Sequence, residues 1–228
     1  SSRRQRQMCI RDRSERTLSL FSDSTRDKLL KKSLELFNKK GYVSVTTSLL
    51  ASSSNVREGN LWYHFKSKKN LVESHIELFK ENISLKLESV DRIDLEILIK
   101  KLFSQYYFNW DFRYLFRDNL VNNFSNDRSL ASKLNDLTVL RFNKIKEEAL
   151  IGREVGVFDF KDNEIEELSE IIFLLADNWF ALSSKKYPDK DEEFLVRRGM
   201  RLLIKASEPY LSVGSKKVIN NLYGEFSI

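Results

Sequence analysis

The sequence has little cysteine, proline, glycine and histidine, and it has no long hydrophobic run. Cys9 is the single cysteine among 228 residues, which excludes an internal disulfide bond and a cluster of thiolate metal ligands. Two Pro and seven Gly leave long stretches of chain unbroken, and this favours helices. No run of roughly 18 apolar residues occurs, so we expect neither a membrane span nor a membrane partner. No apolar signal segment opens the chain, so we expect a cytoplasmic protein.

The sequence also lacks the motifs that carry catalysis. It contains no phosphate-binding glycine loop, no HExxH motif and no nucleophile elbow. With two His and one Cys, the chain offers no clear nucleophile and base pair, and His75 has no second metal ligand at helical spacing. We therefore expect no enzyme, no metal site and no cofactor. An enzyme in the second half of the chain is an alternative that no motif supports.

The positive charge is concentrated near the start of the chain. Residues 1–23 carry six Arg against three acidic residues, and residues 24–75 carry ten Lys and Arg against four. Because the total charge is +6, the rest of the chain carries a net charge of −3. A basic first third beside an acidic remainder is typical of a nucleic-acid-binding domain followed by a different module, although charge runs are also ordinary solvated surface.

One stretch organises the chain, and it reads TTSLLASSSNVREGNLWYHFKSKKNL, residues 46–71. Thr46 is expected to cap a first short helix, because a threonine hydroxyl accepts a free amide proton of the opening turn. Asn55 tolerates the left-handed backbone conformation that a tight turn requires. Leu61 and Phe65 lie four residues apart and give a second helix one buried side. This pattern predicts a helix-turn-helix, whose second helix enters the major groove of DNA.

The same stretch resembles the DNA-binding domain of the TetR/AcrR family of bacterial transcriptional regulators, over residues 24–79. The positions that carry the resemblance are Gly41, Tyr42, Thr46 to Ala51, Asn55, Val56, Gly59, Leu61, Tyr63 to Phe65, Lys68 and Leu71. Three positions depart from the family pattern. Asn55 replaces the turn glycine, Arg57 replaces a Ser or Thr, and Trp62 replaces a Tyr.

The resemblance implies a set of contacts with double-stranded DNA. Lys66 and Lys68 are expected to hold phosphates, while Asn60 and Glu58 are suited to read adenine and cytosine. The full set of predicted DNA-binding residues is Thr46, Thr47, Ser48, Arg57, Glu58, Gly59, Asn60, Trp62, Tyr63, His64, Lys66 and Lys68.

The predicted fold is all-α. Residues 1–23 are interpreted as a basic tail, either disordered or foreign to the natural protein, or alternatively as an arm that follows the phosphates. Residues 24–70 form the predicted three-helix DNA-binding domain, and residues 71–228 form a larger helical ligand-binding and dimerisation domain. A helix over residues 71–87 is expected to be the only covalent and rigid link between the two.

The second domain is rich in aromatic residues that are expected to line a pocket. A small-molecule site is a mostly apolar cavity with a few polar groups, often between helices. The alternative is that these aromatics only fill a core. The predicted pocket residues are Tyr106, Tyr107, Trp110, Phe112, Phe116, Asn119, Asp177 and Trp179.

Further helices are expected over residues 112–124, 129–151, 163–184, 191–207 and 211–223. In the family, the last two long helices form a four-helix dimer interface, and here the resemblance points to residues 163–184 and 191–207. The resemblance therefore implies a homodimeric, ligand-responsive repressor that binds an inverted repeat in response to an unidentified small-molecule effector. The alternative is a TetR-like helical module that has lost DNA binding and acts through protein contacts.

Overall fold

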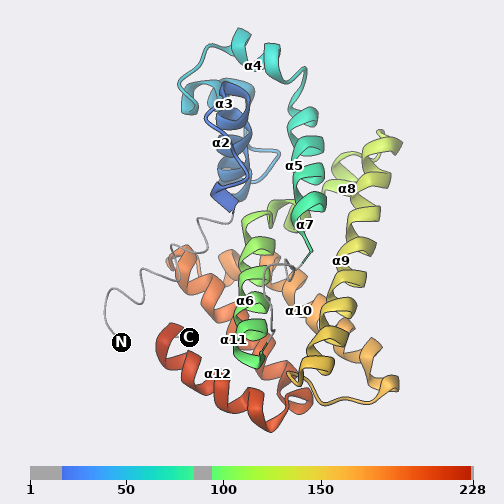
Figure 1. Ribbon diagram of the computed structural model, residues 1–228. Coiled ribbons are helices and arrows are strands. Elements are labelled where there is room, and N and C mark those ends of the chain that lie inside the picture. Colours follow the sequence, from blue (N-terminus) through green and yellow to red (C-terminus); the bar gives the residue numbers. More distant parts are fainter. Residues whose placement is uncertain (1–16, 85–93, 227–228) are drawn as a thin grey trace. The chain divides into compact units, whose positions relative to one another are not determined.

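The computed structural model describes residues 17–84 and 94–226 and confirms the all-α fold (Figure 1). The first helices are α2 (Thr25–Lys40), α3 (Thr47–Ser53), α4 (Glu58–His64) and α5 (Lys68–Asn82). The later ones are α6 (Leu95–Asp111), α7 (Tyr114–Arg117), α8 (Leu120–Asn123), α9 (Arg128–Val155), α10 (Ile165–Lys186), α11 (Glu192–Ser207) and α12 (Val213–Phe226). Short 3-10 turns, η1 (Asp162–Glu164) and η2 (Glu208–Tyr210), precede α10 and follow α11. Within these residues, no helix is long and apolar enough to cross a membrane.

The chain folds into two compact units, and each unit is assembled from separate segments. Among the described residues, the N-terminal unit contains residues 17–82 and 111–137, and the C-terminal unit contains 83–84, 94–110 and 138–226. The chain therefore passes between the units after residues 82, 110 and 137. The expectation of one covalent link is wrong, because α6 and α9 are also continuous helices across such a passage.

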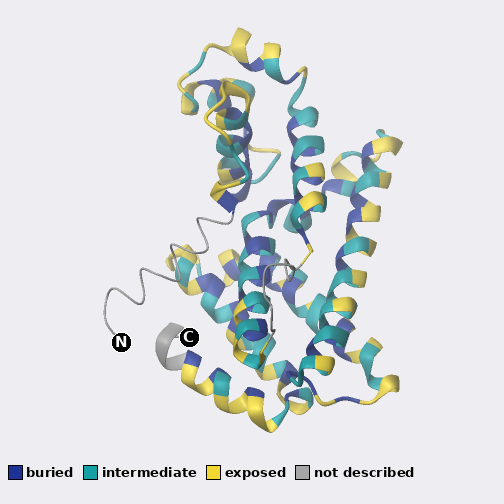
Figure 2. Cartoon of the chain, viewed as in Figure 1, coloured by how far each residue is buried: buried dark blue, intermediate teal, exposed yellow. Residues whose placement is uncertain are grey.

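In the N-terminal unit, α2 begins and ends where the sequence predicts. The backbone amide of Asp27 donates to Ser24 Oγ at 3.1 Å, so Ser24 satisfies one of the free amides of the first turn. Gly41 ends the helix with a φ of +82°, a conformation that residues with a Cβ rarely adopt. Leu30, Leu34 and Phe37 form the buried side of α2. Figure 2 shows buried residues of the chain in dark blue.

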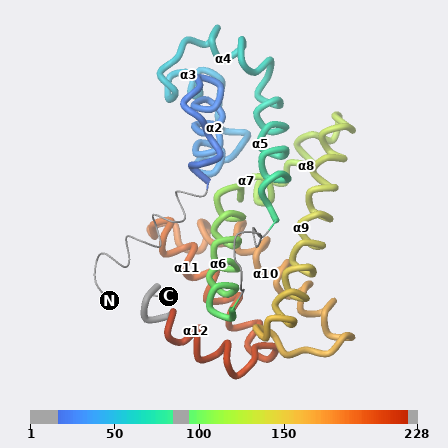
Figure 3. The backbone as a smooth tube through the Cα atoms, in the orientation of Figure 1, coloured from blue at the N-terminus to red at the C-terminus, as the bar shows by residue number. Residues whose placement is uncertain are grey.

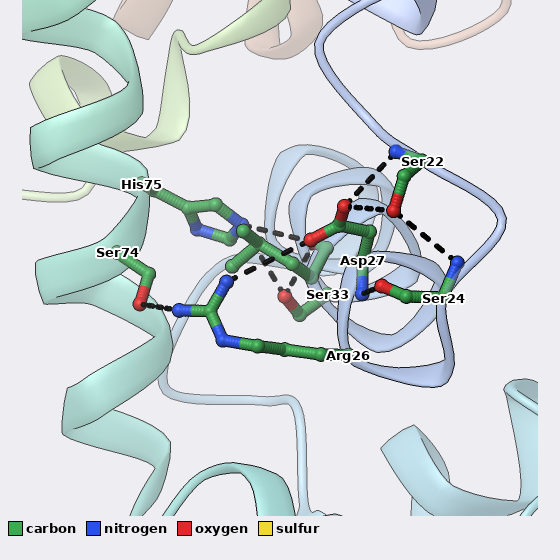
Figure 4. A network of polar contacts seen from close by, with 8 residues as sticks. Ser22, Ser24, Arg26, Asp27, Ser33, Ser74 and His75 are labelled. Carbon is green, nitrogen blue, oxygen red and sulfur yellow. Dashed lines mark hydrogen bonds and ion pairs between the residues drawn. The ribbon is translucent and has the colours of Figure 1, made fainter.

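Some of the predicted tail is part of this unit. Thr17 is buried, and its hydroxyl donates to Asp111 Oδ2 at 2.6 Å. Ser22 donates to Asp27 through both its backbone amide and its hydroxyl (Figure 4). Residues 17–23 are thus tied to the fold, whereas residues 1–16 lie outside the described residues.

Helix α5 is held to α2 by a buried histidine and a serine (Figure 4). His75 Nε2 lies 2.9 Å from the backbone oxygen of Leu30, which only accepts, so Nε2 carries the proton. His75 Nδ1 then accepts from the Tyr114 hydroxyl at 2.7 Å. Ser74 accepts from Arg26 Nη2 at 3.3 Å. Burial lowers the pKa of His75 to about 4, so the ring is neutral at pH 7.

Two predicted helices end or break earlier than expected. The helix predicted over residues 71–87 ends at Asn82, whose side-chain amide donates to the backbone oxygen of Leu78 and so competes with the helix ladder. Residues 85–87 lie outside the described residues. The helix predicted over residues 112–124 is split into α7 and α8, because Asn119 adopts a φ of +49°.

The C-terminal unit contains α6, the later part of α9, and α10, α11 and α12, which Figure 3 traces in chain order. Helices α10 and α11 form a packed pair, in which Trp179 Nε1 donates to the backbone oxygen of Leu195 at 2.8 Å. Gly199 of α11 faces the side chains of Tyr106 and Trp179. A Cβ at this position would lie 2.0 Å from the Tyr106 hydroxyl, so only glycine permits this close packing of three helices.

Candidate nucleic-acid interface and cavity

The helix-turn-helix forms as the sequence predicts. Thr46 Oγ1 accepts from the backbone amide of Leu49 at 3.2 Å, which caps α3. Asn55 makes the turn with a φ of +57°, and the amide of Val56 donates to the oxygen of Ala51 at 3.0 Å. Leu61 of α4 is 1% exposed, so the two short helices share one core. The predicted DNA-binding residues therefore lie on α3, on α4, or beside their ends.

The outer side of α4 exposes two large aromatic side chains. Tyr63 is 84% exposed and Trp62 is 40% exposed, which is unusual for residues of this size. Asn60 is also exposed. Gly59 lies between them, and a Cβ at this position would meet nothing within 4 Å. The packing of the chain therefore does not require glycine at this position. On the exposed side of α4, the missing side chain leaves room for a partner to approach the helix backbone closely.

Two of the predicted DNA-binding residues bond to each other. Ser48 of α3 donates its hydroxyl to Glu58 Oε1, at the first turn of α4. A carboxylate at a helix N-terminus is favoured by the helix dipole. The bond therefore fixes the start of α4 against α3, and it occupies one of the carboxylate oxygens that would meet a base.

Lys68 is directed into the fold, whereas Lys66 is exposed. Lys68 Nζ donates to the backbone oxygens of Tyr42 at 2.8 Å and Val45 at 2.9 Å, and it lies 4.1 Å from the centre of the Tyr42 ring. Burial lowers the pKa of this ammonium group. Lys68 therefore ties the loop between α2 and α3 to the start of α5. The predicted phosphate contact has at most one ammonium proton left to use.

We expect replacement of Lys68 by alanine to destabilise the protein by about 1 kcal/mol, because two hydrogen bonds to carbonyl oxygens are lost from a partly exposed site. Lys66→Ala is the matched control, and it should leave the stability within about 0.5 kcal/mol of the wild type. Urea unfolding of both variants measures the difference. Equal stability of the two variants would show that Lys68 does not hold the loop.

The segment after α6 is bonded to the end of α2, inside the N-terminal unit. Arg117 donates to the backbone oxygens of Phe37 at 3.0 Å and Asn38 at 2.7 Å, in the last turn of α2, where carbonyls need partners beyond the helix. Asn38 Nδ2 donates to the oxygen of Asp111 at 2.6 Å, and its Oδ1 accepts from the amide of Tyr114 at 3.1 Å. These residues form the α2 clamp, defined here as Asn38, Asp111, Tyr114 and Arg117.

The predicted aromatic pocket is divided between the two units. Phe112 and Phe116 belong to the N-terminal unit, where their rings lie 5.4 and 5.3 Å from the ring of Phe79. Asn119 also belongs to that unit, at the break between α7 and α8. Sequence neighbours on either side of residue 110 therefore pack into different cores.

The C-terminal unit contains a partly open cavity of about 160 Å³. Of the predicted pocket residues, only Tyr106 lines it. Tyr107 and Trp110 do not line the cavity. The Tyr107 ring lies 6.3 Å from that of Tyr106, and Trp110 Nε1 donates to Glu192 Oε1 at 2.9 Å. The lining residues are Ile99, Leu102, Phe103, Gln105, Tyr106, Asn109, Arg141, Ile145, Glu148, Ala149, Val157, Phe158, Ile172, Ala176, Met200, Leu203, Ile204, Ser207, Leu211 and Ile219.

A buried arginine at the cavity was missed in the sequence. Arg141 of α9 has a side chain that is 2% exposed, and its Nη2 contacts Asp177 Oδ1 at 2.6 Å. Asp177 does not line the cavity, but it forms an ion pair with Arg141, which does. Trp179 is likewise absent from the lining. The available signal in the sequence was the position of Arg141, which continues the apolar helix face of Leu130, Leu134 and Leu137.

Within the described parts of the chain, no group of acidic, His and Cys residues could hold a metal ion.

Comparison with known proteins agrees with this architecture. The family model described as bacterial regulatory proteins of the tetR family matches residues 29–74, and the TetR model described as bacterial transcriptional repressor matches residues 79–218. The second match alone covers more than half of the chain, and the chain belongs to the TetR family. It is a DNA-binding transcriptional regulator of a non-enzymatic family, which confirms the family and the class predicted from the sequence.

Individual relatives are more distant. IcaR of Staphylococcus aureus, the negative transcriptional regulator of the biofilm operon icaADBC, is 23% identical over 168 residues, which cover 70% of this chain and 84% of IcaR. YttP of Bacillus subtilis, a probable transcriptional regulator, is 35% identical over 66 residues, 29% of this chain and 32% of YttP. A TetR-family regulator from Marinobacter aquaeolei has the same fold, with a TM-score of 0.70 at 24% identity over 89% of this chain and 98% of that one. SmeT, solved as a complex with triclosan, has a TM-score of 0.56 at 16% identity, over 84% of this chain and 93% of SmeT.

Proposed function

We propose that the protein is a homodimeric, ligand-responsive repressor that binds an inverted-repeat operator. The observation that carries this proposal is the outer side of α4, where Trp62 and Tyr63 are exposed to solvent beside the helix-turn-helix. The similarity to IcaR, a negative regulator, supports repression, and the similarity to SmeT, which was solved with triclosan, supports control by a ligand. The alternative, a module that has lost DNA binding, is favoured only by the bulky Trp62 and the acidic Glu58, and Ser48 donates a hydrogen bond to that carboxylate.

Contacts with DNA divide into two kinds. Asn60, Trp62, Tyr63 and His64 on α4 supply contacts to bases and to the sugar-phosphate chain, and they set the sequence preference. Lys66, Arg57 and the free amides at the start of α3 hold phosphates and set the position on the duplex.

Dimerisation is assigned to α10 and α11 because they expose apolar side chains. Leu174 and Leu182 on α10 are 58% and 49% exposed, and Phe194 on α11 is 37% exposed. Stable interfaces between identical subunits are apolar and resemble a protein core cut in half. A second copy of this surface would cover all three residues.

Ligand control is assigned to α6. This helix contributes Phe103 and Tyr106 to the cavity lining, and its last residue, Asp111, belongs to the α2 clamp. A ligand changes DNA affinity only through its different affinities for the two states of the protein. We therefore expect that a movement of α6 which breaks the clamp shifts α2 and the helix-turn-helix.

We expect DNA selected from a random pool to contain an inverted repeat, with half-site centres roughly 34–36 Å apart. The double variant Leu174→Glu, Leu182→Glu should be monomeric and should bind the selected site at least about tenfold more weakly, because one subunit then holds only one half-site. Val139→Glu is the matched control and should remain dimeric, because Val139 is an apolar residue of α9 that is exposed to a similar degree but lies outside α10 and α11. Sedimentation and fluorescence anisotropy measure the two properties. A wild-type monomer at micromolar concentration that bound a single half-site would refute the proposal.

A further inference from the structure

We propose that α10 of a second copy of this chain lies antiparallel along α11, over an open groove on the outer side of that helix. This inference rests on the proposed homodimer and adds which helix meets which and the charged residues that select this pairing. The groove, the order of charges on the two helices and the levels of their residues each contribute to it.

The start of α11 and the turn before it carry an open groove of about 510 Å³. Its lining is Tyr187, Asp191, Glu193, Phe194, Arg197, Arg198 and Arg201. Arg197 is paired with Glu193 of the same helix. The side chains of Arg198 and Arg201 make no ion pair or hydrogen bond with any residue that the structure describes. The groove therefore offers the exposed ring of Phe194 beside two available cations.

The outer side of α10 carries an ordered stripe of residues. Glu170, Leu174, Asn178, Leu182 and Lys185 are exposed and follow one another at three or four positions, so they share one side of the helix. Read along the helix, this stripe is acidic, then apolar, then basic. It therefore fits a partner surface on which the charges run in the opposite order.

The outer side of α11 has that order when the helix is read backwards. Asp191, Phe194, Arg198, Arg201 and Lys205 follow one another at three or four positions and share one side of the helix. This stripe is acidic at its start, aromatic next and basic over the rest. An antiparallel α10 therefore meets opposite charges at both ends and an aromatic ring between them.

Both stripes lie on the outer surface of the C-terminal unit. Ala176 and Phe180 are the buried residues on the opposite side of α10, and Val196 and Met200 are those on the opposite side of α11. The two helices are joined by a short turn and pack against each other, so they run antiparallel. One surface thus presents the two stripes side by side.

Contacts within one subunit give the levels of the residues along this surface. Trp179 Nε1 donates to the backbone oxygen of Leu195 at 2.8 Å, and the same indole ring lies against Gly199. Trp179 is therefore level with the turn between residues 195 and 199. Because each residue of a helix advances about 1.5 Å along its axis, Leu182 is level with Phe194.

A two-fold axis parallel to the helices keeps these levels between subunits, since rotation moves no residue along the axis. Counted in the same way, Glu170 of the partner subunit lies level with the last turn of α11, within reach of Arg201 and Lys205. Lys185 of the partner subunit lies level with Asp191. A two-fold interface repeats every contact, so each of these pairs occurs twice.

The other two-fold arrangement places each helix against its own copy. In that case α11 meets α11 of the partner, and around the middle of the helix Arg198 faces Arg201 of the partner subunit. Like charges that face each other across an interface oppose association. The charge order of α11 therefore selects α10 as its partner.

The test reverses one charge on each helix of the full-length protein, as Glu170→Lys and Arg201→Glu. Each variant alone should dimerise about tenfold more weakly than the wild type in sedimentation experiments, because two attractions per dimer become repulsions. An equal mixture of the two variants should regain the dimer, because in a mixed pair the reversed charges face each other. Native mass spectrometry should find more mixed dimer than random exchange gives.

Several results would overturn the proposal. A mixture that stays as weak as the single variants would remove the pairing of Glu170 with Arg201. A stronger dimer in Arg201→Glu would show that α11 meets its own copy. An Arg201→Glu variant that dimerises as the wild type does but binds the selected DNA more weakly would show that the basic stripe contacts DNA.

Matched controls and salt test whether the charges act directly. Glu154→Lys on α9 and Lys217→Glu on α12 change exposed charges of the same unit and should dimerise as the wild type does. The weakening in Glu170→Lys and Arg201→Glu should shrink between about 0.1 and 1 M salt, because the screening length falls from about 10 to 3 Å. Weakening that does not change with salt would contradict a direct charge contact.

A comparison with the leucine variant separates this inference from the proposed function. If the double variant Leu174→Glu, Leu182→Glu is monomeric while both charge variants dimerise as the wild type does, the helix pairing is wrong and the homodimer stands. If the wild type is monomeric at every concentration, the homodimer itself fails, and the pairing fails with it.

Discussion

The affinity of the protein for its operator is expected to fall about 10³–10⁵-fold between roughly 50 and 200 mM salt, as it does for proteins that make six to ten phosphate contacts. The basis is the net charge of +6 over residues 24–75, which contains the whole helix-turn-helix. Each lysine or arginine that neutralises a phosphate releases a condensed counterion, and salt opposes this release. Fluorescence anisotropy with the selected DNA over a series of salt concentrations measures the slope.

Single lysines test where this salt dependence originates. Lys66→Ala should weaken binding to all sequences alike and lower the logarithmic slope by about one unit, because one phosphate contact is lost. Lys217→Ala is the control, since Lys217 is an exposed lysine of the C-terminal unit on α12. An affinity that does not respond to salt would favour the alternative of a module without DNA binding. A change of base preference in Lys66→Ala would show that Lys66 contacts bases.

The helix-turn-helix was predictable because its signals are local. The cap at Thr46, the left-handed turn at Asn55 and the four-residue spacing of Leu61 and Phe65 each depend on neighbours within one or two helical turns. The start of α2 at Ser24 and its end at Gly41 are predictable for the same reason. Within such a short range, the residue types leave few alternative conformations.

Side chains that bond across long separations were not predictable. Lys68 was expected to face DNA, but its ammonium group bonds to carbonyl oxygens more than twenty residues earlier in the chain. Arg117 caps α2 from 79 or 80 residues away. No sequence period encodes such partners, because they depend on how the helices pack. The same packing decides that Arg141, which no motif marked, lies at the cavity.

The aromatic cluster shows the limit of arguments from composition. Trp110 and Phe112 are two residues apart, yet Trp110 bonds to Glu192 in the C-terminal unit and Phe112 packs on Phe79 in the N-terminal unit. The direction of each side chain at the end of a helix determines which core it enters. An aromatic-rich stretch therefore indicates buried surface without indicating a shared pocket.

Lowering the pH from 7 to 4 is expected to remove roughly 3 kcal/mol of stability through His75 alone, because its pKa falls from 6.5 in the unfolded chain to about 4 in the fold. The ring is completely buried, and its neutral form fits two partners. Nε2 donates to the backbone oxygen of Leu30, and Nδ1 accepts from Tyr114. A second proton on Nδ1 would oppose the Tyr114 hydroxyl and would place a charge among apolar side chains.

The direction of the effect follows from proton linkage. Between pH 6.5 and about pH 4 the unfolded chain binds a proton at His75 that the folded chain does not, so stability falls as the pH falls through this window. Above pH 6.5 both states are neutral and the contribution of His75 is constant. Urea unfolding at a series of pH values measures the slope. Carboxylates contribute to it as well, so the slope of a variant is needed to isolate His75.

His75→Gln is the informative variant, because glutamine keeps one donor and one acceptor but does not titrate. We expect it to be less stable than the wild type at pH 7 and to lose less stability than the wild type between pH 7 and 4. His64→Gln, at the end of α4, is the matched control and should keep the wild-type pH dependence. If His75→Gln and the wild type lost equal stability over this range, His75 would not be the group that senses acid.

Because Ser33 and Leu30 of α2 lie against the His75 ring, protonation of His75 should also loosen α2 from α5 before the whole protein unfolds. Hydrogen exchange of the α2 amides at pH 5 would show this as faster exchange in the wild type than in His75→Gln.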